Sequence, residues 1–371
     1  MFRFDRRLIY YFDWVMLLLL LLVCVMALAN LFSSTWSGGS AASPVFYKQF
    51  YILLGGFALT LILISFDYRE LETLGFLFYG IIIILLIYTG FFVHTTIAGT
   101  QRWINLGFFR LQPSEPAKLI MIIVLASYFS RRETGDGYSL RDIIKPGILT
   151  AIPFVLILIQ PDLGTALMLA ILFVSMVLFV KMRWSTLAFL GSLGAVSGFV
   201  LWKFVLKDYQ RRRIETFLNP EGDPMNQGYQ IMQSKIAVGS GQIFGKGFME
   251  GTQGHLHFLP ERHTDFAFSV WAEEWGFAGS VFFLGCYFFM LLWGINIAMT
   301  ARDKFGVLMA FGIVMLIFWQ AVINLLMIMG FLPVVGIPLP LFSYGGSSLL
   351  TTLIGIGLLM NIRMRRFQVK Q

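Results

Sequence analysis

The sequence predicts an all-α integral membrane protein with about ten transmembrane helices and one large extracytoplasmic loop. Of its 371 residues 57% are hydrophobic and only 13% are charged, and the mean hydropathy is +0.76. A soluble domain is about 45–50% apolar and about 25% charged, so the excess of apolar residues is expected to face lipid. These proportions exclude a soluble globular chain.

Apolar runs long enough to cross a bilayer follow one another along almost the whole chain. The first is preceded by Arg6 and Arg7, like a signal peptide, but it is longer than a signal-peptide core, so we expect an uncleaved first span. The fourth and fifth runs are short and the eighth is long, which leaves their boundaries uncertain by several residues. The predicted spans cover residues 14–32, 49–65, 73–93, 116–129, 143–159, 163–180, 185–206, 266–300, 306–332 and 343–362.

The distribution of basic residues predicts the orientation of these spans. The net charge is +8, from 28 Lys and Arg against 20 Asp and Glu. Cytoplasmic loops retain positive charge, and a cytoplasmic N-terminus places more than half of the basic residues on the cytoplasmic side. Both termini then face the cytoplasm, and residues 207–265 form the extracytoplasmic loop within a single domain, 1–371. The positive charge thus reports topology, and we expect no nucleic-acid partner.

A few charged residues lie close to the predicted spans, where an unpaired charge costs at least about 2.5–3.5 kcal/mol. Glu115 and Lys118 are spaced i, i+3 at the start of the fourth span and can pair along one helix face. Asp162 stands between two spans, where a carboxylate can cap the next helix. For each feature two interpretations stay open. The pair or the cap is purely structural, or its polar groups line a cavity.

Glu273 and Glu274 fall just inside the eighth span, so at least one of them needs a partner or a place in the bundle interior. The long loop before this span holds the densest polar chemistry, including Arg213 and a series of glycines. It ends with Thr264 and Asp265, either of which is a candidate cap for the eighth span. The alternative for Asp265 is a carboxylate held at the membrane surface beside a cavity that lipids can reach.

Several of these motifs resemble one family, the SEDS membrane proteins (shape, elongation, division and sporulation), typified by RodA and FtsW. The short termini and residues 66–69 resemble the RodA branch more than the FtsW branch. The matching stretches run in family order and are residues 101–104, 112–118, 160–165, 213–220, 229–234, 245–247, 259–266, 273–276 and 340–348.

This resemblance implies a peptidoglycan glycosyltransferase that polymerises lipid II at the outer face of the bacterial cytoplasmic (inner) membrane, for cell elongation and rod shape. It implies a class B penicillin-binding protein and the elongation machinery as partners. No cofactor is expected, although a divalent cation at the diphosphate remains an alternative. The resemblance also implies inverting transfer with a β-1,4 product.

The motifs supply the candidate site residues. Asp265 is the expected catalytic general base, because an acceptor hydroxyl loses a proton as it attacks and one carboxylate suffices. A lipid pyrophosphate leaves as a stable anion that cations can hold. The expected substrate-binding residues, with no metal ligand among them, are Arg102, Trp103, Glu115, Lys118, Asp162, Arg213 and Ser343. A lipid II flippase or transporter, and a scaffold for the penicillin-binding protein, are the alternative functions.

Overall fold

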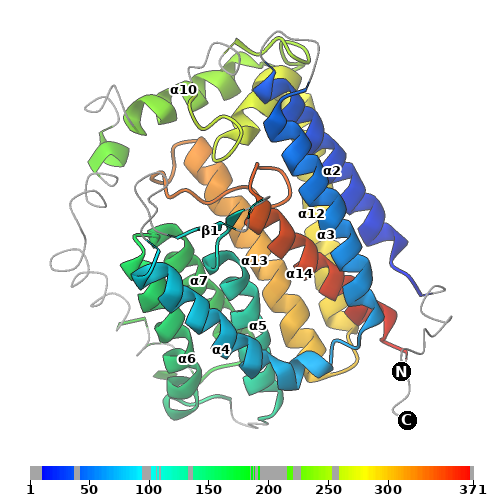
Figure 1. Cartoon of the computed structure of the whole chain (residues 1–371), viewed down its shortest axis with the longest axis vertical. Coiled ribbons are helices and arrows are strands. Elements are labelled where there is room, and N and C mark those ends of the chain that lie inside the picture. Colours follow the sequence, from blue (N-terminus) through cyan, green and yellow to red (C-terminus); the bar gives the residue numbers. More distant parts are fainter. Residues whose placement is uncertain are drawn as a thin grey trace.

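The chain folds into a bundle of long helices (Figure 1). The computed structural model describes residues 11–36, 42–93, 102–105, 107, 110–132, 137–183, 185–186, 188, 191–192, 215–219, 227–252 and 259–367. Within this part, seven helices are long and apolar enough to cross a membrane by length and composition. This confirms the predicted fold class of an all-α membrane protein.

All but one of the predicted spans correspond to a helix in the described residues. The seventh predicted span, residues 185–206, lies almost entirely outside them. The helices are α2 (Trp14–Thr35), α3 (Pro44–Ser65), α4 (Glu70–Phe91), α5 (Ser114–Ser130), α6 (Leu140–Ile159), α7 (Leu163–Phe179), α12 (Ala267–Thr300), α13 (Lys304–Ile328) and α14 (Gly346–Met364).

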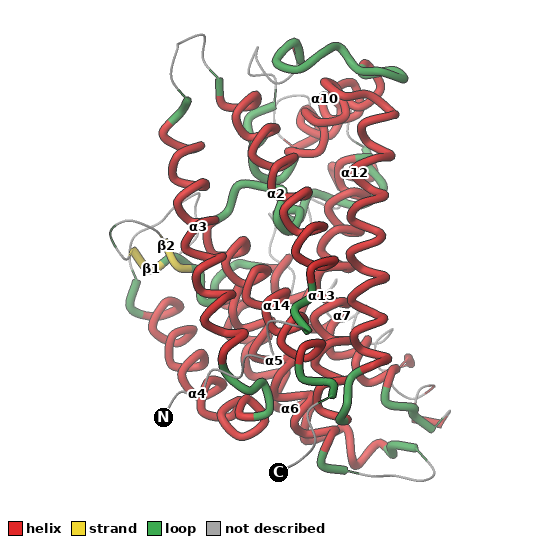
Figure 2. The backbone as a smooth tube through the Cα atoms, turned by 90° about the vertical axis from the view of Figure 1, so that its right-hand side faces the viewer, coloured by secondary structure: helices red, strands yellow, loops and turns green. Residues whose placement is uncertain are grey.

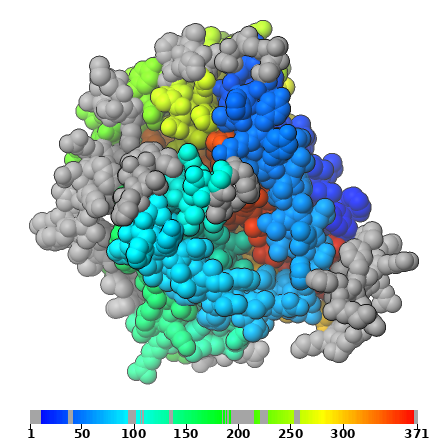
Figure 3. Space-filling view, in the orientation of Figure 1, coloured from blue at the N-terminus to red at the C-terminus, as the bar shows by residue number. Residues whose placement is uncertain are grey.

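The helices are sorted into an interior group and an outer group. Helices α5, α13 and α14 are buried along most of their length, whereas α3 and α4 expose many large apolar side chains, such as Leu61 and Ile84. A helix that is apolar on every side suits a lipid environment, so the outer group is the part of the bundle that faces lipid. The red surface of α14 is visible between the blue surface of α3 and the cyan surface of α4 (Figure 3).

Ion pairs define the two ends of the bundle. Arg363 Nε lies 3.4 Å from Asp13 Oδ2, so α2 begins and α14 ends at the same end, which we call the terminal end. Arg69 pairs there with Asp303, which precedes α13. The opposite end, called here the cavity end, holds the starts of α5, α7, α12 and α14. The tube view shows the long helices running between these two ends (Figure 2).

Two small elements complete the cavity end. Strands β1 (Ile104–Asn105) and β2 (Arg110–Leu111) pair as an antiparallel hairpin that leads into α5. Helix α10 (Gln227–Ser240) packs on α12 and on the end of α13, where Ser234 Oγ donates to the Ile328 carbonyl at 2.9 Å. The sequence predicted only a polar loop in this region.

Helix α12 differs from its prediction at two points. Its N-cap is Phe266, without a side-chain cap bond, so the expectation that Thr264 or Asp265 caps this helix is wrong. The helix is also kinked at Gly276, whose φ is 63°, because residues of a neighbouring glycine-rich loop form hydrogen bonds with its backbone there. Lys246 N donates to the Glu273 carbonyl at 3.0 Å, and Phe277 N donates to the Gln242 carbonyl at 2.8 Å.

Glycine is required where this loop meets α12. A Cβ atom at Gly245 would stand 2.1 Å from the Glu274 carbonyl oxygen, too close for any side chain. The two buried glutamates find partners in this loop and in α2. Lys246 Nζ lies 2.6 Å from Glu273 Oε1, and Ser33 Oγ donates to Glu274 Oε1. The prediction that at least one of these acids has a partner or lies in the bundle interior is confirmed.

Candidate functional site

A polar cavity of about 690 Å³ opens at the cavity end of the bundle. Its walls come from segments far apart in the sequence: α3, the β-hairpin, the starts of α5, α7 and α14, the turn before α12, and the connection between α13 and α14. The predicted site residues that line it are Arg102, Trp103, Glu115, Lys118, Asp162 and Asp265. The fold therefore gathers most of the residues that the sequence singled out.

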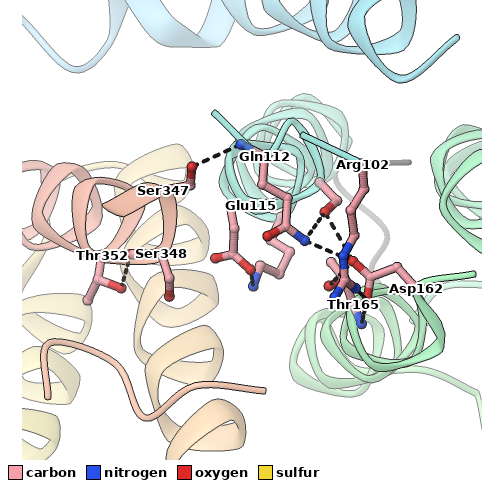
Figure 4. A network of polar contacts seen from close by, with 10 residues as sticks. Arg102, Gln112, Glu115, Asp162, Thr165, Ser347, Ser348 and Thr352 are labelled. Atoms are coloured by element: carbon pink, nitrogen blue, oxygen red, sulfur yellow. Dashed lines mark hydrogen bonds and ion pairs between the residues drawn. The ribbon is translucent and has the colours of Figure 1, made fainter. Parts of the chain in front are cut away.

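One wall of the cavity is a network centred on the Asp162 carboxylate. Asp162 Oδ1 lies 3.1 Å from Arg102 Nη1 and also accepts from the Thr165 backbone N–H, which caps α7 as predicted. Asp162 Oδ2 accepts from the Gln112 side-chain amide at 2.9 Å. Figure 4 shows Arg102 and Gln112 converging on Asp162 from the hairpin side. The cap therefore also orients a guanidinium at the cavity wall, so both predicted readings hold.

The Glu115 and Lys118 pair lies nearby in α5. Lys118 Nζ is 2.8 Å from Glu115 Oε1, with the residues 1% and 5% exposed. Both residues line the cavity although they are almost entirely shielded from solvent. Burying an ion pair costs desolvation on both sides, so it is retained only with good geometry. The predicted pairing is confirmed, and the pair faces the polar hollow rather than lipid.

Asp265 also lines the cavity, from the turn that precedes α12. The turn is held by backbone bonds, since Phe266 N donates to the Glu261 carbonyl and Tyr344 N donates to the His263 carbonyl at 2.8 Å. Glu261 and Thr264 line the cavity beside Asp265. The Thr264 hydroxyl donates to Glu261 Oε2 at 2.7 Å. A carboxylate therefore stands at one wall of a hollow whose other walls carry cations.

The family model described as "Cell cycle protein", covering FtsW, RodA and SpoVE, matches residues 8–368. The chain belongs to this family. A protein from Escherichia coli K12 named peptidoglycan glycosyltransferase MrdB is 37% identical over 354 residues, covering 95% of this chain and 94% of that one. Peptidoglycan glycosyltransferase RodA from Treponema pallidum is 34% identical, covering 96% and 98%.

Solved structures of family members have the same architecture. The crystal structure of the rod shape determining protein RodA from Thermus thermophilus matches with a TM-score of 0.71 at 30% identity, covering 96% of this chain and 98% of that one. A chain from a structure described as the coordination of polymerization and crosslinking by a peptidoglycan synthase complex matches with a TM-score of 0.81 at 31% identity, covering 96% and 99%.

Of the two remaining expected site residues, only Ser343 belongs to the described part of the chain, and it is absent from the lining of the cavity. Arg213 lies outside the described residues. Ser343 is 4% exposed, and its hydroxyl accepts from the Leu339 backbone N–H at 3.0 Å, behind the cavity wall. Ser347 and Ser348, one turn further on, are the serines that line the cavity. Ser347 Oγ accepts from Gln112 N at 2.9 Å and so ties α14 to the hairpin (Figure 4).

The cavity also has cationic lining residues that the sequence did not single out. Lys48 comes from α3 and Arg110 from the hairpin. Lys48 is a lone cation at the edge of an apolar run, a signal that could have marked it. Glu273, by contrast, is absent from the residues that line the cavity.

No group of three or more His, Cys, Asp or Glu side chains is arranged to hold a metal ion in the described part of the chain. His255 and His257, a weak metal signal in the sequence, lie outside it. The carboxylates that line the cavity are Glu115, Asp162, Glu261 and Asp265.

Proposed function

We propose that this chain polymerises lipid II in the cavity, with Asp265 as the general base. It is a peptidoglycan glycosyltransferase of the RodA type, as its membership of the family and its relatives indicate. One observation supports the site assignment most strongly: Asp265 lines the same cavity as Arg102 and Lys118, which come from other parts of the chain.

The chemistry suits this arrangement. The Asp265 carboxylate takes the proton of the acceptor sugar hydroxyl as the oxygen attacks the anomeric carbon of the donor. The bond from that carbon to the pyrophosphate oxygen breaks, and attack from the opposite face gives inversion and a β-1,4 link. The leaving pyrophosphate is a stable anion and needs no second carboxylic acid. Arg102 and Lys118 stabilise it by charge-assisted hydrogen bonds.

A second hollow supports a lipid-linked substrate. It is an apolar groove of about 890 Å³ lined mainly by α3, and it shares Lys48 and Ile52 with the polar cavity. A polyprenyl chain in the groove would place its pyrophosphate near Lys48 and its sugar in the cavity. The two hollows thus match the apolar and polar parts of one amphiphile.

The orientation and partners follow from the same proposal. The cavity end faces outwards and both termini face the cytoplasm, because basic residues concentrate at the terminal end. The chain is a bacterial multi-pass membrane protein of the cytoplasmic membrane. Its partner is a class B penicillin-binding protein, which cross-links the strands, and the similar chain from a peptidoglycan synthase complex supports this. The elongation machinery is the further partner.

A reconstitution experiment tests this function against the two alternatives. The purified chain and its partner, with the partner's transpeptidase blocked, receive lipid II, and glycan strands are resolved on gels. We expect strands from the parent and none from Asp265→Ala. If Asp265→Ala polymerises as well as the parent, the base assignment is wrong. If the parent makes no strands while liposomes show lipid II crossing the bilayer, the chain is a flippase. If it shows neither activity, the scaffold function remains.

A further inference from the structure

A single asparagine ties the turn that carries Asp265 to a second segment of the cavity wall. Asn324 lies near the end of α13 and is 0% exposed. Its side-chain amide nitrogen donates to the Asp265 backbone carbonyl at 2.9 Å and to the Ile337 carbonyl at 2.8 Å. Because both partners are acceptors, only the nitrogen of the amide can face them, and both of its hydrogens are used.

The second partner belongs to a segment that touches both sides of the site. Residues 334–338, in the connection between α13 and α14, line the cavity. A Cβ atom at Gly336 would stand 3.6 Å from Asp265 Oδ2. On the other side, a Cβ atom at Gly164 would stand only 2.5 Å from the Val335 carbonyl oxygen. This segment is therefore packed between Asp265 and the start of α7, where Asp162 holds Arg102.

Asn324 therefore fixes the spacing between the turn that carries Asp265 and the segment that abuts α7. The proposed reaction depends on this spacing. It holds the turn that carries Asp265 and the segment that abuts α7 to one point on a buried helix. Removing the amide frees both carbonyls, and each then moves to find another donor because a buried carbonyl without a partner is costly. The base and the cation that receives the leaving group would then shift relative to each other. A misplacement of about 1 Å can slow a positioned reaction by about 100-fold.

We propose that Asn324 is a positioning residue for the transfer step, which holds Asp265 in register with the Arg102 and Asp162 wall. This inference rests on the proposed function of the cavity. Asn324 touches no substrate in this account, so its loss slows transfer and leaves the affinity for lipid II unchanged. A residue needed only for folding would instead reduce the number of intact sites.

Asn361 provides a matched control at the terminal end. It is also 0% exposed, and its side-chain amide nitrogen donates to the Leu63 and Phe66 carbonyls, both at 2.7 Å. These carbonyls close the end of α3, away from the residues that line the cavity. The two asparagines therefore share burial and donor chemistry and differ in what they hold.

The test compares Asn324→Leu and Asn361→Leu, which keep the side-chain size and remove the donors. For each, lipid II binding gives the dissociation constant and the number of sites per chain, and turnover is expressed per binding site. We expect Asn324→Leu to lose about 100-fold in kcat per site with a dissociation constant within about twofold of the parent. Asn361→Leu is expected to stay within about threefold of the parent in kcat per site.

Asn324→Ser keeps the test decisive if the leucine variant fails to fold. Serine is smaller and retains one donor, so an intermediate loss of about tenfold is expected. Kcat per site equal to that of the parent in a folded Asn324 variant would overturn the inference, as would equal losses in the two leucine variants. A parent that binds lipid II but makes no strands would contradict the proposed function instead.

Discussion

The two ends of the bundle carry nearly the same polar motif with different surroundings. At the cavity end, Asp162 caps α7 and pairs with Arg102 at 3.1 Å. At the terminal end, Asp303 caps α13 and pairs with Arg69 at 3.2 Å. Asp162 and Arg102 line a cavity of about 690 Å³, whereas Asp303 and Arg69 are absent from the lining of both hollows found in the described structure.

The rest of each network follows the same division. At the terminal end, Tyr68 donates its hydroxyl to Asp303, and Arg365 donates to the Ile64 carbonyl, so polar groups close helix ends. At the cavity end, Lys118 and Asp265 surround an open space. A capping aspartate paired with an arginine therefore does not by itself identify a functional site. Such a pair is a helix cap alone where other side chains enclose it, and a candidate binding site where it lines a cavity.

The largest expected effect on stability comes from the buried ion pair. Lys118→Met leaves Glu115 uncompensated at 5% exposure and is expected to lower the free energy of unfolding by about 3–5 kcal/mol. Arg131→Met at the terminal end breaks a pair with Glu72 in which the Arg131 side chain is 53% exposed, and should lower it by less than about 1 kcal/mol. Denaturation in detergent micelles measures both, and equal losses of stability would contradict the difference between the buried and the exposed ion pair.

Substitution of the two capping-pair arginines tests the comparison through catalysis. Arg102→Gln removes a cation from the cavity wall and is expected to lower kcat/KM for lipid II by about 10–100-fold, as for a lost charge-assisted hydrogen bond. Arg69→Gln breaks the equivalent pair away from the cavity, so its kcat/KM should stay within about twofold. Initial rates over a range of lipid II concentrations measure both. A larger loss in Arg69→Gln would reverse the assignment of the two ends.

Two glycines at the cavity end have the same backbone strain and different neighbours. Gly330 and Gly336 both have a φ of 70°, so alanine brings similar backbone strain, about 1 kcal/mol, at either position. The added methyl group at Gly336 faces Asp265, whereas at Gly330 it meets the flexible Lys235 side chain. We expect Gly336→Ala to lower kcat several-fold and Gly330→Ala to lower only the Tm. Equal kcat values would show that the segment beside Asp265 tolerates displacement.

The smallest expected effect concerns pH. Burial lowers the pKa of the His263 imidazole below its usual value of 6.5. The folded state then binds fewer protons than the unfolded state, so the stability contribution is complete above pH 6.5 and is lost as the pH falls below it. Between pH 7.5 and 5.5 the Tm of the parent should fall slightly more than that of His263→Gln. An identical fall in Tm in both proteins would show that His263 does not contribute to the pH dependence of stability.

The sequence predicted the helices well where apolar runs dominate. Residues 116–129 correspond to α5 and residues 163–180 to α7, because a helix inside such a bundle consists of a continuous run of apolar residues. Helix α10 was missed because it lies in a polar segment without a membrane-length run. The kink of α12 at Gly276 was missed because it depends on backbone hydrogen bonds with a loop that is distant in the sequence.

The candidate site was predictable in composition but not in geometry. Glu115 and Lys118 are three residues apart, so their pairing follows from helix periodicity. Arg102 and Asp162 are far apart in the chain, and only the fold brings the hairpin to the start of α7. Asn324 gave no motif at all, although a buried amide inside an apolar run is itself a signal.

The most direct test of the central claim compares two aspartates that differ in what they face. Asp265→Asn removes the proposed base at the cavity, while Asp303→Asn keeps a good helix cap at the terminal end. With kcat measured per lipid II-binding site, we expect Asp265→Asn to lose at least about 100-fold, as general-base catalysis typically contributes. Asp303→Asn should stay within about threefold. Strand synthesis by Asp265→Asn at the rate of the parent would contradict the account.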